Sequence, residues 1–307
     1  SQRYRKELEA ANRYADQLLK SREKMILTVT HDIKSPLSSV IGYIELLNNT
    51  PINERQRYFL KNMRGSSEHI LKLIGNLLDL SKLENNKMPV EHIVFNPYHL
   101  FQEITDNFMP LAAAKHLELK ARFSEDLDKD YSGDALRIRQ VLSNILSNAV
   151  KYNRENGHIY ISCMEIPSEQ PEMTTMEFVC RDTGIGMTEE FQKHIFEPFA
   201  QEYTGSRTKF VGTGLGMAIA RKLVEKMGGT ITFESEKGVG TTFVIRVPFK
   251  IDLDADKREE QKDVSEKSIK GLHILLAEDN ELNMEIAEFV LQNEGADVTK
   301  AWDGQEA

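Results

Sequence analysis

The stretch His31-Asp32-Ile33-Lys34-Ser35-Pro36-Leu37 lies inside a long amphipathic helix and places an imidazole on its polar face. At about 100° per residue, apolar side chains gather on one stripe, and His31 lies opposite them among small and polar residues. The apolar stripe contains Leu19, Ile26, Ile33, Leu37, Val40, Ile44 and Leu47, and the opposite stripe contains His31, Ser35, Ser38 and Gly42. We therefore expect His31 to project outward. We also expect the helix to loosen or kink near Pro36, which has no backbone N–H.

The sequence on either side of this stretch predicts a helical hairpin. Before His31, apolar residues recur at alternating three- and four-residue steps, which is typical of a coiled coil. Asn48-Asn49-Thr50-Pro51 ends the helix, and a second apolar stripe predicts another helix from about Glu54 to Glu84. A single hairpin has little against which to bury these stripes. We therefore expect two chains to pair into a four-helix bundle, which makes the protein a homodimer.

The pattern changes after Met88-Pro89, where strands and helices alternate up to Lys250. Asn96-Pro97 is typical of an N-cap followed by the first helical residue. We predict helices at about 97–115, 134–152 and 217–227, and strands at about 117–123, 158–166, 176–182, 230–236 and 241–248. This order predicts an α+β sandwich in which a helix layer covers a mainly antiparallel sheet.

Composition limits the class of protein. A chain of 307 residues with 40% hydrophobic content is long enough for two or three domains. Its 39 basic and 48 acidic residues give a net charge of −9, which argues against a nucleic-acid-binding protein. No apolar run is long enough to cross a bilayer. Cys163 and Cys180 lack metal-ligand spacing and are expected to be buried thiols in a reducing cytosol.

A pair of asparagines on the helix predicted at 134–152 gives the first indication of chemistry. Asn144 and Asn148 stand one turn apart, so their amide oxygens can face one hard cation. Lys151 lies near Asn148 on the same surface and can reach a phosphate. Taken alone, the pair fits two merely exposed side chains better than a cation site.

Two glycine-rich segments follow. Asp182-Thr183-Gly184-Ile185-Gly186 comes at a strand end, where a carboxylate can accept from an adenine amino group or the glycines can simply form a tight turn. Gly212-Thr213-Gly214-Leu215-Gly216 opens a helix, whose first N–H groups form a natural anion site. It matches neither a P-loop nor the Rossmann spacing. Between them, the polar segment 203–211 with Arg207 suits either a mobile lid or a plain surface loop.

Together these segments resemble the H, N, G1, F and G2 boxes of sensor histidine kinases, in family order. The boxes are His31 with its neighbours, the Asn144/Asn148 helix, Asp182-x-Gly184-x-Gly186, Phe196-x-Pro198-Phe199 and Gly212-x-Gly214-x-Gly216. The resemblance covers about residues 25–250. It implies a dimerisation and phosphoacceptor hairpin followed by a catalytic ATP-binding domain of the Bergerat fold.

The resemblance also implies the roles of individual residues. His31 is the expected phosphoacceptor, and Asp32 is the residue expected to orient its ring and take up its proton. Ser35 stands where many relatives carry the Thr or Asn used in phosphatase activity, which leaves that activity in doubt. The implied ATP-binding residues are Asn144, Asn148, Lys151, Tyr152, Asp182, Gly184, Gly186, Arg207, Gly212, Thr213, Gly214, Leu215, Gly216 and Thr241, with Asn144 and Asn148 also holding Mg²⁺.

The last part of the chain carries a second resemblance. Leu272-His273-Ile274-Leu275-Leu276-Ala277-Glu278-Asp279-Asn280 resembles the first strand and the acidic pair of a response-regulator receiver domain, with Glu278 and Asp279 as Mg²⁺ ligands. So short a piece cannot bury a full α/β core, so we expect it to be disordered or held against another domain. The parent is then expected to be a hybrid, membrane-anchored kinase, of which this chain is a cytoplasmic portion that phosphorylates a receiver domain.

These resemblances divide the chain into five expected segments. They are a signalling coiled coil at 1–24, the hairpin at 25–88, the ATP-binding domain at 89–250, a charged linker at 251–271 and the receiver fragment at 272–307. The connection from Asn85 to Pro89 is the expected hinge between hairpin and ATP-binding domain.

The same residues speak against two alternative functions. ATPases of the gyrase, MutL or chaperone types use a glutamate base where Asn144 stands, and an amide cannot take a proton from water. A silent dimeric scaffold would be expected to lose His31, Asp182 or the glycines. We therefore predict a protein histidine kinase that uses ATP and Mg²⁺.

Overall fold

The computed structural model describes residues 2–124, 127, 129–168, 172–202, 212–251, 269–304 and 306–307. The chain divides into two compact units, one formed by Ser1–Leu78 with Gln261–Ala307 and the other by Asp79–Glu260. Arg207, one of the expected nucleotide ligands, lies outside the described residues.

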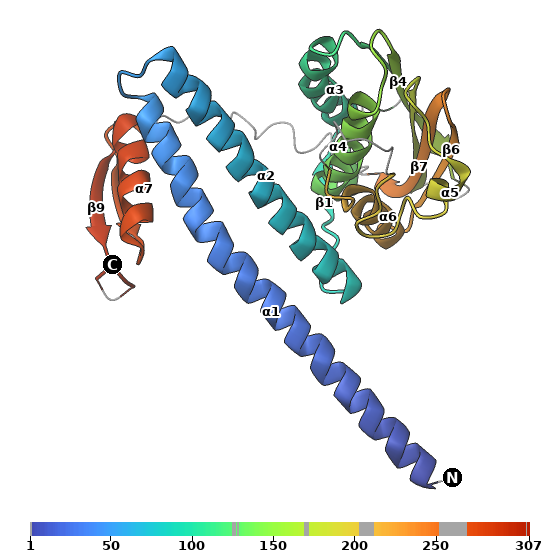
Figure 1. Ribbon diagram of the computed structural model, residues 1–307, viewed down its shortest axis with the longest axis horizontal. Helices are drawn as coiled ribbons and strands as arrows, with labels where there is room; N and C mark the ends of the chain where they lie inside the picture. The colour runs from blue at the N-terminus through green and yellow to red at the C-terminus, as the bar shows by residue number, and fades with distance from the viewer. Residues whose placement is uncertain are drawn as a thin grey trace. The chain divides into compact units, whose positions relative to one another are not determined.

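The first unit contains the predicted helical hairpin (Figure 1). Helix α1 (Gln2–Asn48) continues through Pro36 without a break, and α2 (Glu54–Glu84) has the predicted bounds. A reciprocal capping box starts α2, in which Asn53 Oδ1 accepts from Gln56 N and Gln56 Oε1 accepts from Asn53 N, each at 2.9 Å. An ion pair of 3.1 Å between Arg64 and Glu45 joins the two helices.

Much of the apolar surface of the hairpin remains exposed within one chain. Ile44 and Leu60 are buried at 2% and 8% exposure. The side chains of Ile33, Val40, Leu47, Phe59, Met63, Ile70 and Leu77 are all exposed. The predicted stripes therefore exist on both helices, and a single hairpin buries only part of them.

The same unit contains a small strand-helix-strand element made of β8 (His273–Ala277), α7 (Glu281–Asn293) and β9 (Asp297–Ala301). Strands β8 and β9 pair in parallel. Helix α7 packs on α1, where the Ile286 side chain lies against Gly42 and Ser39 Oγ donates to Asn283 Oδ1 at 3.3 Å. The element is therefore ordered and held against another part of the chain, while its assignment to a receiver domain stays a prediction.

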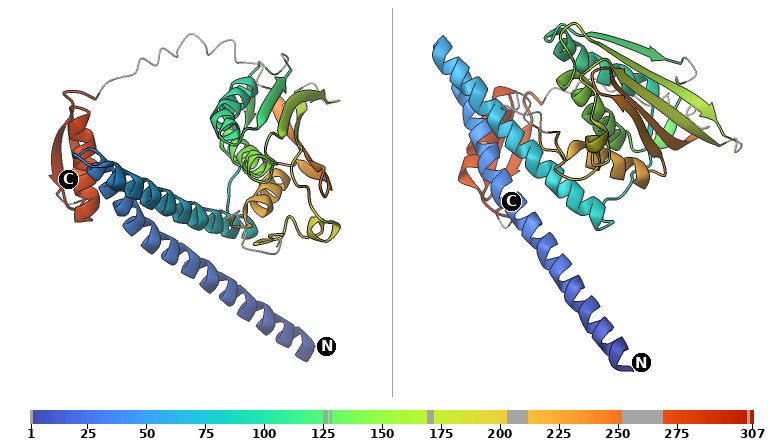
Figure 2. Two further views of the ribbon diagram at one scale, coloured as in Figure 1. Left: turned by 45° about the horizontal axis from the view of Figure 1, so that its top comes forward. Right: turned by 45° about the vertical axis from the view of Figure 1, so that its right-hand side comes forward.

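The second unit is built on a seven-stranded sheet (Figure 2). The strands are β1 (Ile93–Phe95), β2 (Glu118–Phe123), β3 (Tyr131–Gly133), β4 (His158–Pro167), β5 (Met173–Asp182), β6 (Thr230–Glu236) and β7 (Gly240–Ile251). Their order is β1-β3-β7-β5-β4-β2, with β6 also paired to β7. In the described part of this sheet, β2 and β4 pair in parallel and the other five strand pairs are antiparallel, which confirms the predicted, mainly antiparallel sheet.

Helices α3 (Pro97–Ala113), α4 (Ala135–Lys151) and α6 (Gly216–Lys226) cover one face of this sheet (Figure 1). The predicted cap is present, because Asn96 Oδ1 accepts from His99 N at 3.1 Å. A short helix, α5 (Glu189–Gln192), follows β5. Cys163 and Cys180 are buried and free, as predicted, and burial raises the pKa of both thiols.

The end of α2 belongs to the second unit. Leu80, Leu83 and Met88 are at most 8% exposed and join the core of the second unit. The boundary between the units therefore falls after Leu78, ten residues before the expected boundary at 88. The expected hinge at Asn85–Pro89 lies inside the second unit rather than between the two.

Among the described residues, no helix is both long enough and apolar enough to span a membrane.

Candidate functional site

Helix α4 presents a polar edge beside the glycine-rich segment that precedes α6. Its buried side packs on the sheet, while Asn144 donates through Nδ2 to the Gly216 carbonyl at 3.1 Å. Near the end of α4, the Lys151 ammonium lies 2.9 Å from the Tyr152 hydroxyl and 4.6 Å from the centre of its ring. The two expected boxes, N and G2, are therefore in contact.

Asp182 ends β5 and lies next to the first glycine-rich segment. Its Oδ1 accepts from Gly184 N at 2.8 Å, and Ile185 N donates to the Tyr152 carbonyl at 3.0 Å. Burial raises the pKa of the Asp182 carboxyl, and the backbone N–H groups of Gly184 and Thr241 oppose part of that rise. The site thus holds a partly buried carboxyl group that accepts two backbone hydrogen bonds and has lone pairs with which to accept another.

Gly186 and Gly214 are the glycines that this geometry requires. Both have positive φ, +60° at Gly186 and +69° at Gly214. A Cβ atom on Gly186 would lie 1.9 Å from the Glu236 carbonyl oxygen, and one on Gly214 would lie 2.5 Å from the Phe199 carbonyl carbon. The backbone therefore approaches other backbone closely at both glycine-rich segments, where a side chain would not fit.

The start of α6 is held by local contacts. Thr213 Oγ1 accepts from Leu215 N at 3.1 Å, and Leu215 is only 2% exposed. Gly212 leaves so little space beside it that a Cβ atom there would lie 2.5 Å from Lys151 Nζ. Phe199 N donates to the Gly214 carbonyl at 3.0 Å, which ties the F box to the G2 box. The F box also packs against the sheet, since the centre of the Phe196 ring lies 5.7 Å from that of Phe233 on β6.

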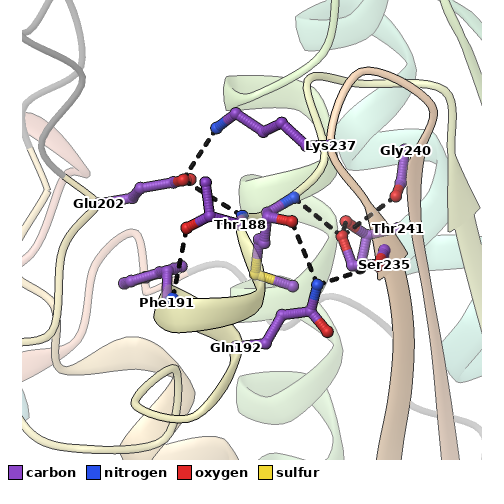
Figure 3. A network of polar contacts seen from close by, with 9 residues as sticks. Thr188, Phe191, Gln192, Glu202, Ser235, Lys237, Gly240 and Thr241 are labelled. Carbon is purple, nitrogen blue, oxygen red and sulfur yellow. Dashed lines mark hydrogen bonds and ion pairs between the residues drawn. The ribbon is translucent and has the colours of Figure 1, made fainter.

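Thr241, the last expected ligand, lies at the start of β7. The register pairs it directly with Asp182 on β5 and with Ser235 on β6. Figure 3 shows the polar network around it, in which Ser235 Oγ lies 2.9 Å from Thr241 Oγ1. Thr241 is 8% exposed, so its hydroxyl is held in a nearly buried position.

The same network reaches the segment that follows the F box (Figure 3). Glu202 Oε1 accepts from Thr188 N at 3.2 Å and from Lys237 Nζ at 2.9 Å. Burial alone would raise the pKa of the Glu202 carboxyl, but Lys237 and Thr188 together lower it. Sequence patterns did not indicate Ser235, Gln192 or Glu202, because most of their partners lie in other segments of the chain.

A further side chain absent from the sequence-based prediction supports the end of α4. Lys115 Nζ donates to the carbonyls of Val150 at 3.2 Å and Lys151 at 3.4 Å. A cation at a helix C-terminus is favourable because the last carbonyls have no helical partner. Lys115 therefore fixes the end of α4 from which Lys151 projects.

The expected phosphoacceptor region lies on α1, in the other unit. His31 and Asp32 are neighbours on that helix, and Ser35 follows about one turn after His31. Asp32 is exposed, and the Ser35 carbonyl accepts from Ser39 Oγ at 3.2 Å. The structure thus gathers the N, G1, F and G2 residues in one unit and places the H box in the other.

The donor types on α4 fit a hard cation. Asn144 and Asn148 offer amide oxygens one turn apart, and the contact of Asn144 Nδ2 with Gly216 leaves its Oδ1 available. Among the described residues, no cluster of three or more His, Cys, Asp or Glu side chains could hold a metal. In the C-terminal element, Glu278 Oε1 accepts from Asn280 N at 3.2 Å and Asn283 Nδ2 at 3.1 Å, while Asp279 is exposed.

Two family models match the chain over the regions described above. The His Kinase A (phospho-acceptor) domain matches residues 21–86, and the histidine kinase-, DNA gyrase B- and HSP90-like ATPase matches residues 133–251. The first contains His31, and the second contains the N, G1, F and G2 residues.

Similar proteins are sensor kinases. The chain is 32% identical over 305 residues to the autoinducer 2 sensor kinase/phosphatase LuxQ of Vibrio cholerae, covering 98% of this chain and 35% of that protein. It is 33% identical over 292 residues to the sensor histidine kinase RcsC of Escherichia coli, covering 95% and 29%. The chain therefore spans about a third of the length of these curated relatives.

One solved structure matches over most of the chain. The crystal structure of full-length ShkA in complex with AMPPNP has a TM-score of 0.62 and 25% sequence identity, and the match covers 92% of this chain and 56% of that one.

Proposed function

The chain belongs to the sensor histidine kinase family, and from that premise we propose that it transfers the γ-phosphoryl group of ATP to His31. The observation that carries the proposal is the convergence of Asn144, Lys151, Asp182 and the 212–216 backbone on one site. The same chain contains the phosphoacceptor hairpin with His31.

The proposed reaction is an in-line phosphoryl transfer. A neutral ring nitrogen of His31 attacks the γ-phosphorus, so that an N–P bond forms as the bond to the β,γ-bridging oxygen breaks and ADP leaves. The other ring nitrogen gives up its proton to the Asp32 carboxylate, the neighbouring residue on α1. Because an unperturbed imidazole is mostly neutral at pH 7, no unusual environment is needed for His31 to attack.

The ATP-binding unit supplies position and charge. The Asp182 carboxylate accepts from the adenine amino group, while Lys151 and the N–H groups around Gly212–Gly216 face the phosphates. Mg²⁺, held by the amide oxygens of Asn144 and Asn148, would neutralise phosphate charge when bound. Arg207 is proposed to add a positive charge to the same phosphates.

The exposed apolar stripes support a homodimer. Ile33 and Val40 on α1 and Phe59 and Ile70 on α2 are exposed within one chain. A second hairpin would cover both stripes in a four-helix bundle. We propose that the onward acceptor is the aspartate of a receiver domain, in the same parent protein or a separate one, on the cytoplasmic side of a membrane-anchored parent.

The rival ATPase function meets an obstacle at Asn144. Its amide donates to the Gly216 carbonyl and has no basic group with which to activate water. Water activation is proposed only on the hairpin, where the Ser35 hydroxyl, one turn after His31, could hold a hydrolytic water against the phosphohistidine.

The test is transfer of label from γ-labelled ATP to the intact chain. We expect an acid-labile, base-stable label that His31→Gln abolishes. His69→Gln is the matched control, because His69 is an exposed histidine on α2 of the same hairpin. Free phosphate without labelled protein would instead support the ATPase, and a label that survives His31→Gln would contradict the assignment of the acceptor.

A further inference from the structure

We propose that Ser235 is a specificity-determining residue that fixes the direction of the Thr241 hydroxyl and so makes the pocket select a 6-amino purine. This inference rests on the proposed nucleotide site. It follows from where protons can be placed in the network of Figure 3.

Three residues form a row across adjacent strands. Ser235 on β6 is paired with Thr241 on β7, which is in turn paired with Asp182 on β5. Directly opposed residues point to the same face of a sheet, with Cβ atoms about 4.5–5.5 Å apart. Thr241 N also donates to the Asp182 carboxyl, so the row ends at the group that is proposed to recognise the base.

Ser235 has three polar neighbours, and only one arrangement of protons satisfies them all. Met187 N lies 3.0 Å from Ser235 Oγ and can only donate. The Gly240 carbonyl lies 3.1 Å away and can only accept, so it takes the single proton of Ser235. Ser235 therefore has one lone pair left for Thr241 Oγ1 at 2.9 Å, and Thr241 must be the donor.

The direction of this bond decides what Thr241 offers to a ligand. Because its proton is used on Ser235, the Thr241 oxygen presents only lone pairs. Asp182, when ionised, is also only an acceptor. Together the two residues match a ligand edge that carries two N–H donors, as an exocyclic amino group does. A 6-oxo purine would place an acceptor against them.

The network is held rigidly enough to keep this direction. Gln192 Nε2 donates to the Met187 carbonyl at 3.1 Å and to the Ser235 carbonyl at 2.9 Å, so it fixes the backbone of both partners. Gly240 leaves no space for a side chain, since a Cβ atom there would lie 2.1 Å from the Asp182 carbonyl oxygen.

The experiment compares the binding of ADP and IDP, which differ only at position 6 and N1 of the purine. Neither nucleotide has a γ-phosphoryl group, so no transfer takes place during the measurement. We measure both dissociation constants for the full chain by calorimetry. In Ser235→Ala the freed Thr241 proton can turn toward the base, so we expect ADP affinity to fall about fivefold to tenfold and IDP affinity to change less than about twofold. The preference for ADP should therefore fall at least about 2.5-fold.

Matched variants separate this role from general damage. Ser235→Thr keeps the hydroxyl and should keep the preference, and Thr241→Val should reproduce the loss. The double variant should show no further fall in ADP affinity, because the two substitutions remove the same hydrogen bond. Thr105→Val, which removes a buried hydroxyl of α3 that donates to the Phe101 carbonyl, should leave both affinities unchanged.

The outcomes are distinguishable. Failure of the unaltered chain to bind ADP at millimolar concentration would overturn the proposed function together with this inference. Suppose the chain binds ADP but Ser235→Ala lowers the affinities for ADP and IDP equally, or changes neither affinity. Ser235 then has only a structural role. If Ser235→Ala does not fold, Thr241→Val and Thr241→Ser decide, since only the second should keep the preference.

Discussion

Gln140 on α4 donates through Nε2 to Oδ2 of Asp79, near the end of α2, over 2.8 Å. Arg137 lies 3.8 Å from the same oxygen. This contact ties the last turns of α2 to the helix that carries Asn144 and Lys151. The pivot between hairpin and catalytic unit is therefore expected before Asp79, and not in the connection at 85–89.

Asp79→Ala should lower the stability of the catalytic unit by about 1 kcal/mol, because one partly buried hydrogen bond to a charged acceptor is lost. The measurement is the unfolding transition that ADP shifts upward, since the bound nucleotide identifies the unit. Asp106→Ala, at an exposed position of α3, should change this transition by less than about 0.5 kcal/mol. An equal effect of both variants would contradict the role of Asp79.

Leu83→Ala should destabilise the same unit by about 2–5 kcal/mol, because Leu83 is 8% exposed and belongs to its core. Leu136→Ala is the matched control, since Leu136 on α4 is 60% exposed and should cost little. If Leu83→Ala leaves the ADP-dependent transition unchanged, the end of α2 is not part of this unit.

Asp182→Asn should abolish nucleotide binding without lowering the stability of the free chain. Burial raises the pKa of Asp182, so the folded state holds the carboxyl proton more tightly than the unfolded state does. The contribution of this carboxyl to the free energy of unfolding is therefore lost as the pH rises through its pKa in the folded state. Asparagine has no such proton to lose, so the variant avoids this loss of stability. ADP affinity of the unaltered chain should fall as pH drops through the same pKa, because the carboxylate loses its charge.

These pH effects are measured by calorimetry of ADP binding and by thermal unfolding, each with Asp182→Asn alongside. The stability gain of Asp182→Asn should be present at neutral pH and shrink as the solution is acidified. A variant that is less stable than the unaltered chain at neutral pH would contradict the explanation.

Gly214→Ala should weaken ADP binding at least about tenfold, because a Cβ atom at φ +69° would meet the Phe199 backbone at 2.5 Å. Gly65→Ala on α2, where nothing lies within 4 Å of the added atom, should leave ADP affinity unchanged. Equal affinities in the two variants would show that the 212–216 backbone does not form the site.

Local patterns predicted most of the elements, and tertiary contacts explain what they missed. The bounds of α2 and the Asn96 cap depend on neighbours in sequence, so they could be predicted. Strands β1 and β3 have only three residues each and exist through pairing with one another and with β7. The Glu202 contacts and the attachment of Leu83 likewise join segments far apart in the chain.

The candidate site likewise combines features that local sequence predicts with features that depend on tertiary contacts. The boxes from Asn144 to Gly216 are short motifs, and their combination in family order predicted a nucleotide site that no single motif could. Ser235 carries no such sign, because its role depends on the register of β6 and β7. The position of the unit boundary also depends on side-chain packing, which the helical periodicity of α2 does not reveal.

The most direct test of the central claim is to locate the phosphoryl group on the intact chain after incubation with ATP and Mg²⁺. Digestion at neutral pH followed by mass spectrometry should find the phosphoryl group on the peptide that contains His31, with fragment ions that assign it to the imidazole. A phosphoryl group on any other residue, or an unmodified His31 peptide in a chain that binds and consumes ATP, would contradict the account.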